Sequence, residues 1–195
     1  MGRKPSITRD SAARAALAIV DESGPAALSL ARVAAALNVR APSLYNHFAD
    51  KAEILGEVAR IVVLDSGRVP DPEPGRWREW LVEEATLFRR SLLRHPHAVP
   101  LVVEYLPQQL LVRLYRQSSR LLAANGVPEG MHLFLLEAAH RMTLGSAISA
   151  ATGRAALESL DLDDDGHPRP ASEAEDERRF VEMVQAFVRG VDLPP

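Results

Sequence analysis

The chain has 195 residues, 47% of them hydrophobic, which is enough to bury a core in one large domain or two small ones. Cysteine is absent, so disulfides, thiol catalysis and cysteine-based zinc sites are excluded. No apolar run approaches the ~18 residues that span a bilayer, and Met1-Gly-Arg-Lys lacks the apolar segment of a secretory signal. These features predict a soluble cytoplasmic protein.

The formal net charge of −3 is unevenly distributed along the chain. Residues 1–51 contain seven Lys or Arg and four Asp or Glu, a balance of +3, so the remainder carries −6. A basic segment on an acidic body favours contact with nucleic acid at the basic end. The asymmetry is modest, and chance clustering is the simpler alternative.

The first helix is predicted to follow Thr8, whose hydroxyl can cap the first-turn amides. An apolar stripe at helical spacing runs along this segment, and Gly24-Pro25 ends it. The stripe consists of Ala13, Ala16, Leu17 and Val20. We expect this helix to brace the two that follow, with Arg3 and Lys4 free near a nucleic-acid backbone.

Residues 29–48 have the pattern of two short helices joined by a tight turn. Ser29 suits an N-cap, Asn38 tolerates the left-handed backbone of a short turn, and Pro42 fits the first position of a helix that runs to Phe48. The apolar face of the first helix is Leu30, Val33, Ala34 and Leu37; the second buries Leu44 and Phe48 and leaves Ser43, Tyr45, Asn46 and His47 to solvent. A helix that reads the major groove of DNA requires several hydrogen-bonding side chains on a short segment, as here. The segment is therefore predicted to be a helix-turn-helix.

The run "RVAAALNVRAPSLYNHFADKAEIL" closely resembles the DNA-binding segment of the TetR family of bacterial transcriptional repressors. The matching features are Leu-Tyr-x-His-Phe from Leu44 to Phe48, Lys51 three residues later, and the alanine-rich first helix. The resemblance covers residues 6–66. Beyond them it weakens to a pattern of helices, with "RSLLRHPHAVPLV" from Arg90 to Val102 similar to ligand-domain segments of actinobacterial members.

The resemblance implies an all-α fold with a DNA-binding domain at residues 6–66 and a regulatory and dimerisation domain at residues 76–192. In the family, a dimer places two reading helices in successive major grooves of a palindromic operator. Arg40, Ala41 and Asn46 are then candidate specificity positions, and Ser43, Tyr45 and His47 would meet phosphates or base edges. Contacts to the sugar–phosphate backbone of DNA would come from Ser29, Arg32 and Lys51. Such contacts set the register of the protein on DNA rather than its sequence preference. Pro42 is also a candidate DNA-binding residue. The alternative is that helical geometry points the Arg32 side chain away from the DNA.

A fourth helix is predicted to connect this head to the rest of the chain. Asp50 and Glu53 form a capping-box-like pair at its start. Its apolar face is Ile54, Leu55, Val58, Ile61 and Val62. The segment "SGRVPDPEPGR", residues 66–76, then marks the domain boundary, because its proline and glycine content excludes a helix.

The second domain is also predicted to be helical. Trp77, Leu81, Phe88 and Leu92 mark a helix that ends near His95-Pro96, and a short apolar segment, residues 98–106, follows. A helix marked by Leu110, Leu111, Leu114, Leu121 and Leu122 stops at Asn125-Gly126, and residues 128–153 are apolar on most sides. Residues 157–177 are acidic, with glycine and two prolines, and are expected to be a mobile loop before a final helix.

Two of these helices present faces that suit a partner. Small residues at Ala138, Gly145, Ser149 and Thr152 line the long helix, and Phe180, Val184, Phe187 and Val191 form an apolar seam on the last one. Two helices from each of two chains would make a four-helix bundle, the homodimer that the resemblance also implies. The alternative is that both faces pack inside one subunit.

Polar residues interrupt the apolar helices of the second domain, where they would line a ligand pocket or pair with one another. The candidate pocket residues are Glu104, Tyr105, Tyr115, Glu137, His140 and Arg141. Glu137 and Arg141 are four residues apart and could simply pair along the helix, and His140 alone could be structural. The tetracycline repressor has a drug-contacting histidine where this chain has Gly67, so the resemblance does not extend to tetracycline–metal recognition.

Catalytic and metal-binding motifs are not found. The sequence has no glycine-rich phosphate loop, no His-x-x-x-His and no Gly-x-Ser-x-Gly, and "DLDDDG" at residues 161–166 lacks the alternating ligands of a calcium loop. We therefore expect no enzyme, cofactor or metal, but a ligand-responsive repressor whose partners are a double-stranded DNA operator, a second copy and an unidentified small-molecule effector, with no membrane. The alternatives are an activator, or an intracellular small-molecule-binding helical protein with a vestigial DNA head.

Overall fold

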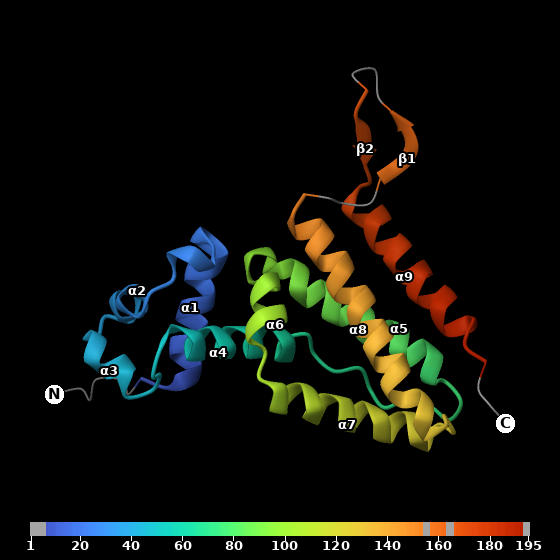
Figure 1. The fold of residues 1–195 in the computed structure, drawn as a ribbon, viewed down its shortest axis with the longest axis horizontal. Coiled ribbons are helices and arrows are strands. Elements are labelled where there is room, and N and C mark those ends of the chain that lie inside the picture. The colour runs from blue at the N-terminus through green and yellow to red at the C-terminus, as the bar shows by residue number, and fades with distance from the viewer. Residues whose placement is uncertain (1–6, 154–156, 163–165, 193–195) are drawn as a thin grey trace.

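The chain folds into a small helical head and a larger helical body that meet along helix α4 (Lys51–Leu64) (Figure 1). This computed structural model describes residues 7–153, 157–162 and 166–192. The predicted all-α fold is confirmed, because helices build both parts. Arg3 and Lys4 lie outside the described residues. Among the residues that are described, no helix is both long enough and apolar enough to cross a membrane.

The head consists of α1 (Arg9–Ser23), the 3₁₀ turn η1 (Pro25–Ala27), α2 (Leu30–Ala36), α3 (Ala41–Tyr45) and the first half of α4. Side-chain caps start α1, α2 and α4 as predicted. The Thr8 hydroxyl accepts from the Ser11 amide at 3.0 Å, and the Asp50 carboxylate accepts from the Glu53 amide at 2.9 Å. The Glu53 carboxylate in turn accepts from the Ala49 amide at 2.6 Å, so α4 begins with two satisfied amides.

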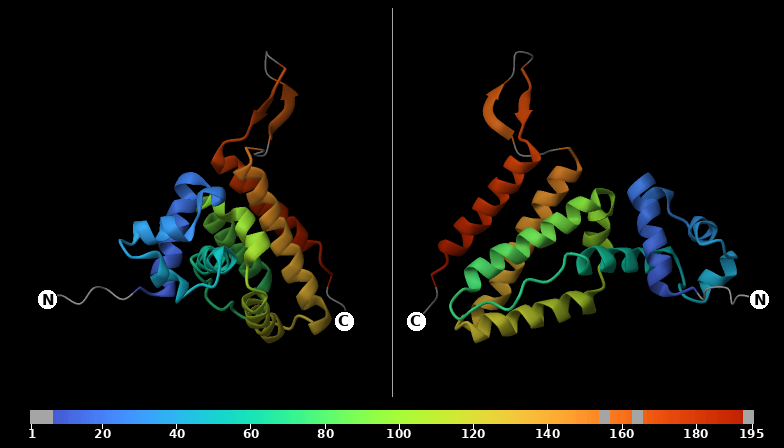
Figure 2. Two further views of the ribbon diagram at one scale, coloured as in Figure 1. Left: turned by 60° about the vertical axis from the view of Figure 1, so that its left-hand side comes forward. Right: turned by 180° about the vertical axis from the view of Figure 1, so that it is seen from behind.

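The body contains α5 (Trp77–Arg94), η2 (Pro96–Ala98), α6 (Val99–Tyr105), α7 (Gln108–Ala124), α8 (Glu129–Ala151) and α9 (Glu173–Arg189). Helix α5 packs against both α8 and α9, and α7 packs against α8 (Figure 1). The segment between α4 and α5 forms no helix or strand, as its composition predicted. Seen from behind, this linker runs between α5 and α7 (Figure 2).

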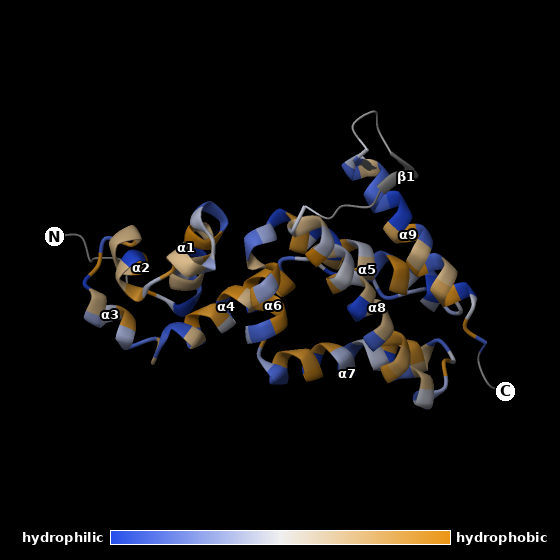
Figure 3. Cartoon of the chain, turned by 45° about the horizontal axis from the view of Figure 1, so that its top comes forward, coloured by the Kyte–Doolittle hydropathy of each residue, from blue (hydrophilic) through white to orange (hydrophobic). Residues whose placement is uncertain are grey.

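One hydrophobic cluster continues from the head into the body. It joins Val20 of α1 and Val58 of α4 to Leu92 of α5, Val102 of α6 and Ala147 of α8. Figure 3 shows the apolar stretches of α4 and α6 side by side. The approach is close at Gly56, where an added Cβ would lie 3.3 Å from the Tyr105 carbonyl oxygen. The two parts therefore share a core at α4.

A hairpin replaces part of the loop expected at residues 157–177. Strands β1 (Leu157–Leu162) and β2 (Pro168–Pro170) pair antiparallel and stand clear of the helices (Figure 1). Helix α9 also begins within the segment, where the Ser172 hydroxyl accepts from the Glu175 amide at 3.2 Å. The prediction of an irregular loop is wrong here, because paired strands and a capped helix satisfy their backbone groups whatever their acidic content.

The apolar stripe of α9 lies inside the subunit, which corrects the expected dimer seam. Phe180, Val184 and Val191 are buried by the body's own helices and cannot contact a partner. Polar contacts also hold α9 to α5: the Arg78 guanidinium donates to the Val188 and Val191 carbonyls at 2.9 and 3.0 Å. Phe187 is half-buried, and its ring centroid lies 5.8 Å from that of Phe134 on α8.

Candidate nucleic-acid interface and internal cavity

The helix-turn-helix has the predicted arrangement, with one change at its end. Leu44 and Phe48 are buried, and Asn38 has φ 52°, the left-handed conformation expected of the turn. Helix α3 stops at Tyr45, not at Phe48 as predicted. The amides of His47 and Phe48 both bond the Leu44 carbonyl, at 2.8 and 2.9 Å, which turns the chain and brings Phe48 into the core.

The polar side chains of the reading segment reach the surface to different degrees. Tyr45 is 60% exposed, and Asn46 and Pro42 are also exposed. Ala41, Ser43 and His47 are half-buried, and Arg40 is exposed just ahead of α3. Every residue from 40 to 47 except Leu44 therefore has surface available for contact with a duplex.

Ser29, Arg32 and Lys51 come together around η1 at the start of α2. The Ser29 hydroxyl accepts from the Arg32 amide, the Arg32 guanidinium donates to the Ala27 carbonyl, and the Lys51 ammonium donates to the Pro25 carbonyl, each at 3.2 Å. Arg32 thus folds toward this turn but stays exposed. Since Lys51 comes from α4, this cluster also holds η1, just ahead of α2, against α4.

Arg9 anchors the reading segment, a role that the sequence pattern did not reveal. Its guanidinium donates to the His47 carbonyl, pairs with Glu53 at 2.7 Å and Glu57 at 3.2 Å, and lies 4.6 Å from the centroid of the Phe48 ring. These partners are 38 to 48 residues away in sequence, so local spacing could not identify them. Arg9 joins α1 and α4 to the end of α3.

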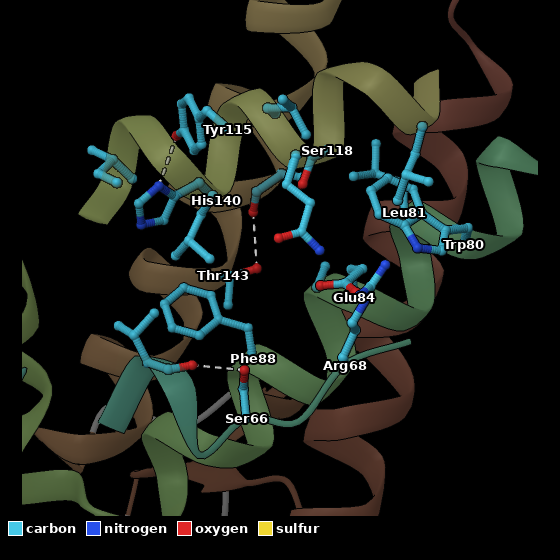
Figure 4. Close-up of a pocket in the computed structure, with 18 of the residues that line it drawn as sticks. Ser66, Arg68, Trp80, Leu81, Glu84, Phe88, Tyr115, Ser118, His140 and Thr143 are labelled. Atoms are coloured by element: carbon cyan, nitrogen blue, oxygen red, sulfur yellow. Dashed lines mark hydrogen bonds between the residues drawn. The ribbon is translucent and has the colours of Figure 1, made fainter. Parts of the chain in front are cut away.

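The body contains a cavity of about 510 Å³, partly open to solvent, between α5, α7, α8, the end of α4 and the linker (Figure 4). Most of its wall is apolar. The residues that bear on its chemistry are Arg68 and Gly67 from the linker, Trp80, Glu84 and Phe88 from α5, Tyr115 and Ser118 from α7, and His140 and Thr143 from α8. A cavity of this size, mainly apolar with a few polar groups, is typical of a small-molecule site.

Polar groups lie at both ends of the cavity (Figure 4). At one end the Tyr115 hydroxyl is 2.8 Å from His140 Nδ1, and burial lowers the pKa of His140, so its imidazole is neutral at pH 7. At the other end lie Trp80, Glu84 and Arg68. His140 Nε2 and Trp80 Nε1 are buried without a hydrogen-bond partner among the described residues. Buried polar atoms are nearly always paired, so both nitrogens lack the partner that such atoms usually have.

Glu84 links the cavity wall to the linker. Its carboxylate accepts from the Val69 amide at 3.1 Å, and the Val69 side chain is buried. Burial raises the pKa of Glu84, while the Val69 amide and the nearby charge of Arg68 act in the opposite direction. At its far end the linker is held by the Gly75 amide, which donates to the Asn125 side chain at 3.0 Å.

Only two of the six predicted pocket residues, Tyr115 and His140, line the cavity. Glu137 and Arg141 pair with each other at 3.0 Å on the outer side of α8, which confirms the alternative interpretation of this pair. Glu104 is exposed on α6, where its carboxylate raises the pKa of the Tyr105 phenol by hydrogen bonding to it. Tyr105 packs against the core shared by head and body. Helical spacing alone did not show which side of each helix faces the cavity.

Comparisons with known proteins agree with this architecture. Residues 13–58 match the family described as bacterial regulatory proteins, tetR family. The chain is 24% identical over 196 residues to the tetracycline repressor protein class D of Escherichia coli, covering 96% of this chain and 90% of that protein.

Two solved structures illustrate the shared fold. The Streptomyces coelicolor TetR family protein ActR in complex with (S)-DNPA has a TM-score of 0.73 and 23% identity, covering 96% of this chain and all (100%) of that one. BioQ with its natural double-stranded DNA operator has a TM-score of 0.65 and 23% identity, covering 92% of this chain and 99% of that one. Residues 13–58 therefore form a DNA-binding domain of the TetR family, and the whole chain has the helix-turn-helix head and helical body of TetR-family proteins.

Proposed function

We propose that the protein is a homodimeric repressor that binds a palindromic operator through α3 and releases it when a small molecule occupies the cavity. The observation that carries this proposal is that α4 reaches both sites. Glu53, near its start, holds Arg9, which binds the His47 carbonyl, and Val63 and Leu64 at its end line the cavity. A rigid helix about 20 Å long, at roughly 1.5 Å per residue, thus connects the cavity to the DNA-reading helix α3.

In the complex, α3 enters the major groove with Arg40, Ala41 and Asn46 as specificity positions. Ser43, Tyr45 and His47 meet base edges or phosphates, Pro42 packs beside them, and Ser29, Arg32 and Lys51 hold the sugar–phosphate backbone. The BioQ structure contains a double-stranded operator, which supports this use of the head. Such a regulator acts in the cytoplasm, where bacterial DNA lies, and we assign it no catalytic role.

The dimer forms on the outer face of α8 and α9. The expected small residues Gly145 and Ser149 are exposed there, beside the apolar side chains of Phe134 (53% exposed) and Ile148 (39%). From α9 the face includes Met183, 43% exposed, and the half-buried Phe187. An apolar surface of this kind favours burial against a second copy, and two α8–α9 pairs make a four-helix bundle.

The effector acts by linkage. A ligand weakens operator binding only as far as it prefers the spacing of the two heads that does not fit DNA. Because the linker that lines the cavity continues directly from α4, a ligand that displaces the linker also shifts α4. The close packing at Gly56 then converts this shift into a rotation of the head over α6.

The test combines two titrations. Compounds that stabilise the purified protein in a thermal-shift screen are added to its complex with DNA from upstream of its own gene, and operator affinity is measured. We expect some stabilising compounds to release the DNA. Stabilisers that never change operator affinity would contradict coupling, and failure to bind any upstream DNA would favour a small-molecule-binding protein with a vestigial head. Whether the bound protein represses or activates is read from transcription of the adjacent gene.

A further inference from the structure

Helix α7 is a basic element in an acidic body. Residues 108–124 contain three arginines and no aspartate or glutamate. Arg113, Arg116 and Arg120 are exposed, and none of them forms an ion pair with another described residue. Several exposed arginines on other helices of the body do have carboxylate partners, for example Arg90 with Glu177 at 2.6 Å and Arg178 with Glu175 at 2.6 Å. The charge on α7 is therefore not used to hold the fold together.

These arginines line a groove that adjoins the cavity. The groove has a volume of about 720 Å³, and its wall contains Arg113, Arg116, Arg120, Val112 and glutamines, without a carboxylate. Arg68 and Gln117 belong to the walls of both the groove and the cavity. A molecule that occupies the apolar cavity can thus extend past these two residues onto the arginines.

We propose that the effector is an amphipathic anion, with an apolar portion in the cavity and a carboxylate, sulfonate or phosphate in the groove of α7. The inference rests on the proposed effector site and specifies its ligand. Guanidinium groups bind such anions through parallel charge-assisted hydrogen bonds. Asp71 already pairs with Arg68 at 2.6 Å, so the three α7 arginines provide the free donors.

The groove is less suited to DNA. Helix α7 lies apart from α3, with α4 and α6 between them (Figure 1). Its arginines also surround the mouth of an apolar cavity, which a duplex cannot occupy. A ligand with both an apolar and an anionic part uses both features.

The test uses two fluorescent probes that differ by one anionic group: anilinonaphthalene sulfonate and uncharged phenylnaphthylamine. The Arg113→Gln/Arg116→Gln/Arg120→Gln variant is compared with Arg76→Gln/Arg178→Gln/Arg189→Gln, which removes the same charge from exposed positions outside both sites. We expect the α7 variant to bind the sulfonate about tenfold or more weakly and the neutral probe with unchanged affinity. The control variant should bind both normally. Unchanged sulfonate affinity in the α7 variant would overturn the proposal.

Cavity-filling variants test whether one ligand uses both sites. Ala139→Phe and, if that variant does not fold, Ser118→Trp should weaken both probes, because each residue lines the cavity. If neither substitution changes sulfonate affinity, the probe binds in the groove alone and the inference is refuted. Loss of operator binding by the ligand-free α7 variant would also refute it. If the sulfonate binds as expected but leaves operator affinity unchanged, the ligand class stands and the proposed release mechanism fails.

Discussion

The cations of the head fall into two groups according to their contacts. Arg9 pairs with Glu53 and Glu57, and Arg14 pairs with Asp10 at 2.9 Å and Asp65 at 3.2 Å. Arg32, Arg40 and Lys51 form no ion pair within the described part of the chain. The first group stabilises the head, and the second keeps its charge available for phosphate.

Lys51 and Asn46 should affect DNA binding in different ways. Lys51→Ala is expected to weaken binding to every DNA sequence. It should also reduce the slope of the logarithm of the binding constant against the logarithm of the salt concentration by about one for each phosphate that the lysine neutralises. Asn46→Ala should instead change the preference among operator variants by about 1–3 kcal/mol, because an amide reads base edges. Operator titrations over a range of salt measure both, with Lys51→Arg as the charge-retaining control. A slope that Lys51→Ala leaves unchanged would exclude its phosphate contact.

His140 should make stability depend on pH. Burial lowers the pKa of His140 in the folded state, whereas in the unfolded chain its pKa is about 6.5. The unfolded state therefore binds more protons as the pH falls below this value, and the free energy of unfolding decreases. His140→Gln should flatten this part of the curve. Urea unfolding between about pH 5 and 8 measures the effect, and equal slopes for His140→Gln and the unchanged protein would contradict it.

At the scale of elements, local features were predictable and the partners of each element were not. The caps at Thr8, Ser29 and Asp50 and the turn at Asn38 depend on neighbours within a few residues, so the sequence contains them. The stripe on α9 was also recognisable, but periodicity does not say whether α5 or a second chain covers it. The cavity combines residues from several segments, and Trp80 and Glu84 carry no pattern that distinguishes them from ordinary helix residues. Most of the residues that line the cavity could therefore not be predicted from the sequence.

Glu84 provides a test of the linker as a moving part. Glu84→Ala removes the acceptor of the Val69 amide and should lower stability by about 1–2 kcal/mol, the usual cost of leaving one partner unpaired. Freed from α5, the linker should also transmit less of the effector signal to α4. Glu84→Gln keeps an acceptor oxygen and should retain most of both properties. Chemical unfolding and effector-dependent operator titration measure these effects; an unaltered effector response in Glu84→Ala would argue against linker control.

At the scale of the whole molecule, the residues that stabilise the subunit differ from those of the proposed dimer interface, because the former are buried and the latter are exposed. The free face of α8 contains Ile148, whereas Val184 of α9 is fully buried against α5. The two positions should therefore respond differently to the same change.

Ile148→Glu should give folded monomers that bind the operator weakly, because it places a charge in the proposed interface without disturbing the core. Val184→Glu should instead unfold the subunit, since the charge would be buried with no partner. Light scattering and circular dichroism measure mass and folding separately. A folded dimer for Ile148→Glu would move the interface to another face.

The core shared across α4 has a consequence for modularity. Since Val58 packs with Val20 of the head and Val102 of the body in one cluster, the head has no complete core of its own. Cooperative unfolding should then include both parts in a single transition. The same sharing limits recombination between regulators: a chimaera that exchanges operator specificity must cut outside α4 or carry the facing surface of α6 with it, because a foreign residue larger than Gly56 meets the Tyr105 carbonyl.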